Sequence, residues 1–170
     1  GEAQINFGTG LFGAAAGVSM AIMAPVWGYL ADRIGKKPMI LRASLGGALV
    51  MVGMAFSPSP AILLVFRVLQ GVFTGTITAY LTLVVTNTPK ERLGLAIGLM
   101  NSAVFFGNSV SPLLGGMFAD LFGYRASFLV AAGLLFISFV RSLLFVRESV
   151  KPDAPAVFSF FADLRTLLSN

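Results

Sequence analysis

The 170-residue chain contains no cysteine and no histidine. It can therefore form neither a disulfide nor a thiolate metal site, and it lacks the commonest general base of enzymes. Charge is also scarce, because only 11% of the residues are charged while 56% are hydrophobic. So few charges cannot cover the surface of a soluble fold of this size. These absences argue against an enzyme, a metal site or a cofactor site, and they favour a membrane protein.

Five apolar runs follow one another along the chain. A helix needs about 20 apolar residues to cross the hydrocarbon core, and a backbone in lipid must be helical to satisfy its own hydrogen bonds. We therefore expect an all-α membrane protein with five transmembrane helices, at about 8–30, 41–57, 60–86, 92–119 and 125–146. Residues 1–147 would form this membrane part. Residues 148–170 would form a cytoplasmic linker with a short amphipathic helix.

The net charge of +5 does not indicate nucleic-acid binding, because the basic residues lie in clusters between the apolar runs. One side of the predicted membrane receives nine of them and the other side receives Arg125. By the positive-inside rule the first side is cytoplasmic. The nine residues are Arg33, Lys36, Lys37, Arg42, Lys90, Arg92, Arg147, Lys151 and Arg165. This orientation predicts an external N-terminus, and without a visible signal peptide it suggests that an earlier helix is missing.

The stretch from Gly28 to Lys37 gathers charge directly after the first apolar run. Its basic residues could simply anchor a cytoplasmic loop, but anchoring needs neither glycine nor aspartate. The stretch resembles the loop motif of the major facilitator superfamily, which lies between the second and third helices of that fold. The residues that carry this likeness are Gly28, Asp32, Arg33, Gly35, Lys36 and Lys37.

Two further stretches agree with this resemblance in order and spacing. Arg67, Gln70 and Gly71 in the third run are similar to the family's fourth-helix motif. The fourth run is similar to the fifth-helix motif of drug/proton antiporters, through Gly98, Gly107, Ser111, Pro112, Gly115 and Gly116. The departure is Ser111, where that pattern has glycine. Three motifs in register are a specific signal. The chain therefore resembles helices two to six of a twelve-helix fold, as a fragment of the N-terminal half.

The resemblance implies a multi-pass transporter of the plasma membrane, with a bacterial inner membrane favoured. It implies proton-coupled efflux of drugs or other small molecules by alternating access around a midplane site. The expected partners are a small-molecule substrate, protons, the lipid bilayer and the missing C-terminal half. In the family, the aspartate corresponding to Asp32 helps to latch the cytoplasmic side shut, and an arginine at the position of Arg67 is implicated in proton coupling. The chain alone should not transport.

Several alternatives stay open. Arg67 lies inside a predicted span, where an arginine costs about 2.5–3.5 kcal/mol on insertion scales, but its side chain could snorkel outward. Gly107, Ser111 and Gly115 share a helix face beside Pro112, which fits either helix packing or a bendable contact with the other half. For the pair Gly71 and Gly75 we prefer packing.

No Asp or Glu lies in the interior of a predicted span. Arginine cannot act as the proton carrier because its pKa is too high, so we expect that carrier elsewhere in the complete protein. Two rival functions are transport of a specific metabolite and a membrane scaffold that does not transport.

Overall fold

The structure is a computed structural model that describes residues 2–146, apart from the side chains of residues 2–9, Asp32 and Thr78. Its elements are α1 (Glu2–Ile34), α2 (Lys36–Ala55), α3 (Pro60–Phe73), α4 (Ile77–Asn87), a 3-10 turn (Lys90–Arg92) and α5 (Leu93–Phe145). Within residues 2–146 there is no strand. The prediction of an all-α protein is therefore confirmed. The amphipathic helix expected in the linker lies outside the described residues.

The turns between helices form where the sequence allows unusual backbone geometry. Gly35 has φ 107° and joins α1 to α2, and Gly123 has φ 78° inside α5. Both values lie in the region that glycine tolerates because it has no Cβ atom. Gly123 divides α5 into a first arm, residues 93–122, and a second arm, residues 124–145. Before α3, the hydroxyl of Ser59 accepts a hydrogen bond from the N–H of Ile62, and Pro60 begins the helix.

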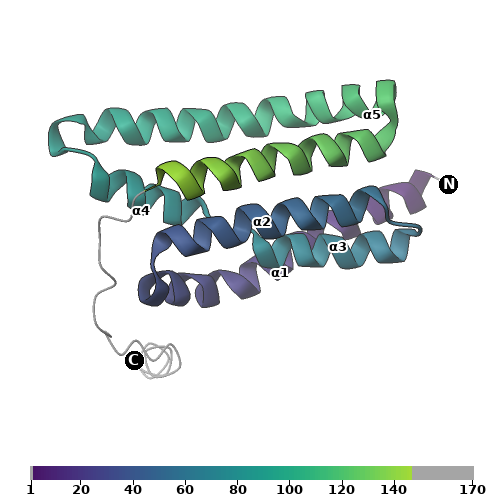
Figure 1. Cartoon of the computed structure of the whole chain (residues 1–170). Helices are drawn as coiled ribbons and strands as arrows, with labels where there is room; N and C mark the ends of the chain where they lie inside the picture. Colours follow the sequence, from purple (N-terminus) through teal and green to yellow (C-terminus); the bar gives the residue numbers. More distant parts are fainter. Residues whose placement is uncertain (1, 147–170) are drawn as a thin grey trace.

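The third predicted span is divided in the structure. One helix was expected across residues 60–86, but α3 ends at Phe73 and α4 begins at Ile77. The three residues between them, Thr74 to Thr76, are called the break below. Gly75 has φ 105°, which interrupts helical geometry and turns the chain. In Figure 1, α4 accordingly diverges from the direction of α3.

The helices run back and forth, so that two ends of the molecule can be distinguished (Figure 1). The junction of α1 with α2, the 3-10 turn and the C-terminus of α5 lie at one end, which we call the basic end. The loop before α3 and the bend at Gly123 lie at the opposite end. Among the described residues the basic end holds Arg33, Lys36, Lys37, Lys90 and Arg92. This distribution agrees with the orientation inferred from the positive-inside rule.

The buried residues gather mainly on α2, which packs on α5, α3, α1 and α4. Ile40 is fully buried there, and Ala48, Val50 and Met54 continue the same core. Among residues 2–146, three helices are long and apolar enough to cross a membrane: Gly10–Ala31, Lys36–Ala55 and Lys90–Phe145, the last of which bends at Gly123. Helix α3 is apolar but shorter. The many exposed apolar side chains of α1 and α5 suit a lipid environment or further protein.

Candidate functional site

The glycines of the loop motif differ in their surroundings. Gly35 is buried, and its N–H donates to the carbonyl of Ala31 at 3.1 Å, which closes the turn after α1. At Gly28, by contrast, no described atom lies within 4 Å of a Cβ built there, so no other segment approaches it closely in the described structure. It instead lines the cavity described below. The side chain of Asp32 is outside the described part of the chain, so the latch stays a prediction.

The basic residues of the loop motif make separate contacts. Arg33 is exposed and its guanidinium lies 4.7 Å from the centre of the Tyr29 ring. Lys37 donates from Nζ to the carbonyl oxygen of Leu143 at 2.9 Å. Leu143 belongs to the last turn of α5, whose carbonyl groups lack partners within the helix and favour a nearby cation. Lys37 therefore ties the start of α2 to the end of α5.

Sequence reasoning missed a contact made by Arg42, which it treated only as an orienting charge. The Arg42 guanidinium lies 3.3 Å from the centre of the Trp27 ring and 5.9 Å from that of Phe73. Trp27, the single tryptophan of the chain, also donates from Nε1 to the carbonyl of Val72 at 2.7 Å. Arg42 thus joins α1, α2 and the end of α3. The available signal was its position inside an apolar run, after Met39, Ile40 and Leu41.

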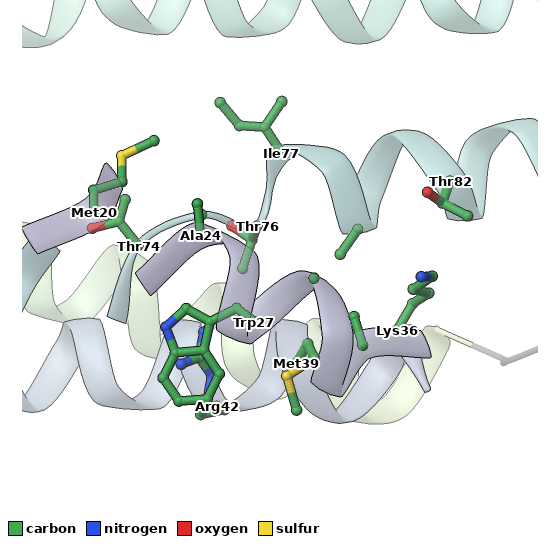
Figure 2. A pocket seen from close by; sticks show the side chains of 14 residues that line it. Met20, Ala24, Trp27, Lys36, Met39, Arg42, Thr74, Thr76, Ile77 and Thr82 are labelled. Atoms are coloured by element: carbon green, nitrogen blue, oxygen red, sulfur yellow. The ribbon is translucent and has the colours of Figure 1, made fainter. Parts of the chain in front are cut away.

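A cavity of about 410 Å³ lies beside this contact, and we call it the Arg42 cavity (Figure 2). Figure 2 shows the Trp27 ring over Arg42, with Thr74 and Thr76 of the break nearby. The cavity is formed by the C-terminal half of α1, the start of α2, the break and the start of α4. It therefore opens where the third predicted span is interrupted.

The fourth-helix motif combines a charge with a close helix contact. Arg67 donates from Nη1 to Oε1 of Gln70 at 3.0 Å, while its buried Nε has no hydrogen-bond partner among the described groups. A Cβ at Gly71 would clash with the carbonyl oxygen of Ala16 and lie 2.8 Å from Cβ of Ser19. The packing expected for Gly71 is therefore observed. Gly75 does not pack in this way and serves the break instead.

A second cavity, of about 580 Å³, brings the fourth-helix and fifth-helix motifs together. We call it the Asn108 cavity. Gln70 enters it from α3, and Asn108 and Ser111 enter it from the first arm of α5. Its described lining is uncharged and combines hydroxyl and amide groups with aromatic and apolar ones: Ala43, Ser44, Gly47, Met51, Gln70, Phe73, Thr74, Thr76, Tyr80, Asn108, Ser111, Leu135 and Ser138. Thr74 and Thr76 line both cavities, so the break is their shared wall.

The remaining fifth-helix residues lie on an open helix. In the described structure no atom lies within 4 Å of a Cβ built at Gly98, Gly107, Gly115 or Gly116. Helix α5 continues through Pro112, and its backbone departs from helical angles at Gly123. One contact joins the two arms of α5 at the motif, where the Ser127 hydroxyl donates to the carbonyl of Gly115 at 3.2 Å. Packing of this glycine face against another described helix is thus not observed.

Comparisons with known proteins identify the family of the chain. The sequence profile of the Major Facilitator Superfamily matches residues 3–169. The chain is 37% identical over 154 residues to the multi-drug resistance efflux pump PmrA of Streptococcus pneumoniae, covering 91% of this chain and 39% of that protein. It is 38% identical over 166 residues to the multidrug resistance protein MdtG of Proteus mirabilis, covering 95% of this chain and 41% of that protein.

The chain belongs to the Major Facilitator Superfamily, a family of membrane transport proteins. The chain is thus multi-pass and integral to the bacterial inner membrane. It spans 39% of the length of PmrA and 41% of the length of MdtG.

Proposed function

We propose that the complete protein is a secondary active transporter that exports drugs or other small molecules in exchange for protons, by alternating access. Family membership and relatives named as multidrug resistance proteins support this proposal. The Asn108 cavity is the observation that carries it, because the residues of two family motifs meet there.

The lining of the Asn108 cavity suits substrates of varied shape. Phe73 and Tyr80 offer aromatic faces, which attract apolar groups and cations. Asn108 and Ser111 offer single polar groups that can donate or accept. Such a wall does not demand one fixed charge on the ligand, and it favours lipophilic compounds, including lipophilic cations. A single metabolite with many hydroxyl groups is the second candidate, because hydroxyl and amide groups also line the wall.

Proton coupling would act on this cavity through Gln70. The amide oxygen of Gln70 accepts from Arg67, and Gln70 also lines the cavity. A fixed positive charge is therefore one hydrogen bond away from the substrate space. Arginine keeps its proton at physiological pH, so the titrating group would be a carboxylate elsewhere in the complete protein. A change in that carboxylate's charge would alter the field at Arg67 and hence the position of Gln70.

The loop and fifth-helix motifs would control access. The open face at Gly107 and Gly115 leaves room for a helix of the C-terminal half to approach closely and limit leak. The junction of α1 with α2 lies at the basic end, where Asp32 would latch the cytoplasmic side to that half. Lys37, which holds the end of α5, would keep this junction in place.

The proposal is tested with the complete protein reconstituted in vesicles that carry an imposed pH gradient. We expect saturable, gradient-driven movement of a fluorescent lipophilic cation, abolished by an uncoupler. A matched panel of metabolites should neither be transported nor compete. Competition by one metabolite at far lower concentration than any drug would favour the second candidate. Absence of transport of any probe would favour the scaffold interpretation and contradict the proposal.

A further inference from the structure

Arg42 is a half-buried cation, and two of its nitrogen atoms are buried without a hydrogen-bond partner within the described structure. Its Nε and Nη1 atoms are buried and have no hydrogen-bond partner among the described groups. Stacking on Trp27 engages the face of the guanidinium, but it supplies no acceptor for the N–H groups in the guanidinium plane. Leaving such groups unpaired in a buried place is unfavourable. A ligand with oxygen acceptors would remove this penalty.

The Arg42 cavity has the size and chemistry to receive that ligand. Its volume of about 410 Å³ falls within the range of small-molecule sites. Lys36 adds a second basic side chain to the lining, and Thr76 and Thr82 add hydroxyl groups. The described lining includes no acidic residue. Met20 and Ile77 supply apolar walls beside these polar groups. The cavity is therefore suited to an anionic group attached to an apolar body.

The position of the cavity along the membrane axis points to phosphate. Arg42 lies six residues after Lys36, which is about 9 Å along a helix from its start. That start is at the basic end, which the positive-inside rule places at the cytoplasmic leaflet. Arg42 therefore belongs to the cytoplasmic half of the predicted span, on the side of that leaflet's headgroups. Lipid phosphate groups lie at that surface of the bilayer, and arginine binds phosphate with paired hydrogen bonds.

We propose that the Arg42 cavity binds a phosphate group, with the Arg42 guanidinium as its principal donor and the Thr76 hydroxyl as a second donor. The phosphate belongs either to an anionic lipid headgroup or to a free phosphate. Thr76 is part of the break and also lines the Asn108 cavity. A bound phosphate would therefore stabilise the conformation of the break, which separates the two cavities. This proposal does not depend on transport, since binding can be measured without it.

The test uses the complete protein purified in a neutral detergent. The unfolding temperature is measured as one of three compounds is added. The compounds are phosphatidylglycerol, diacylglycerol with the same acyl chains, and inorganic phosphate at constant ionic strength. We expect a saturable rise in unfolding temperature with phosphatidylglycerol and none with diacylglycerol. An equal rise with inorganic phosphate would identify a free phosphate as the source. No rise with either phosphate-bearing probe overturns the proposal.

Matched variants assign the effect to the cavity. Arg42→Gln should weaken the response to phosphatidylglycerol about tenfold, as the loss of a charge-assisted contact does. Arg141→Gln removes an equal charge from an exposed position on α5 outside the cavity and should respond as the wild type. Equal weakening in both variants would mean general charge attraction and would refute the site. Should Arg42→Gln fail to fold, Arg42→Lys and Thr76→Val replace it. Wild-type responses in both would refute the site as well.

Discussion

Replacing Gly71 by alanine should force α1 and α3 apart. The new Cβ would clash with the backbone carbonyl oxygen of Ala16 and lie 2.8 Å from Cβ of Ser19. Carbon atoms pack best at about 3.5–4.0 Å, so Ser19 would have to withdraw by about 0.7–1.2 Å. Backbone atoms cannot rotate away as a side-chain tip can. Overpacking of this kind costs about 1–3 kcal/mol of unfolding free energy, which we expect for Gly71→Ala.

The effect is measured by unfolding the complete protein in detergent beside two controls. Gly94→Ala adds the same methyl group at the start of α5, where no described atom lies within 4 Å, and it should leave stability unchanged or slightly raised. Gly46→Ala meets the ring of Phe73, with Cε1 at 2.7 Å, and should be intermediate because a ring can shift. If Gly71→Ala is no less stable than Gly94→Ala, the close contact of α1 with α3 is refuted.

Three further outcomes are expected in the complete protein. Asp32→Asn should insert at normal abundance but transport at least about tenfold more slowly, because anchoring depends on Lys and Arg and hardly on Asp; a normal rate in vesicles would reject the latch. Arg67→Lys should retain substrate binding, but its rate of proton-driven transport should fall about tenfold, since lysine lacks the guanidinium donors that reach Gln70. Proton-driven transport at the wild-type rate would refute this role. Cysteine at Lys36 should resist an impermeant reagent added outside cells, and cysteine at Ser59 should react, with the reverse pattern overturning the orientation.

Much of the fold can be predicted from local sequence patterns. Ser59 and Pro60 begin α3 as their residue types indicate, because a hydroxyl can cap the first N–H groups and proline needs no donor there. Gly35 makes the turn of the loop motif because glycine tolerates positive φ. The all-α prediction likewise follows from apolar runs long enough to require internal hydrogen bonding.

The features that could not be predicted from the sequence depend on contacts between segments that are distant along the chain. Gly75 lies in a run of apolar and small residues that reads equally well as a continuous helix, and its positive φ appears in the structure. The neighbouring Phe73 ring lies against Gly46 of α2, a pairing that no local pattern encodes. In the sequence alone, Arg42 cannot be distinguished from an arginine that anchors a cytoplasmic loop. Its stacking on Trp27 requires knowing that α1 and α2 meet there.

The measurement that tests the central claim most directly is substrate protection of single cysteines on the first arm of α5 in the complete protein. Ser111→Cys places a thiol in the Asn108 cavity, and Ser102→Cys places one on the same helix at an exposed position outside the described lining. With a transported drug bound, alkylation at position 111 should slow by about tenfold, while the rate at position 102 should not change. Equal rates at position 111 with and without a saturating drug, in protein that still transports it, would contradict the assignment of this cavity as the substrate site.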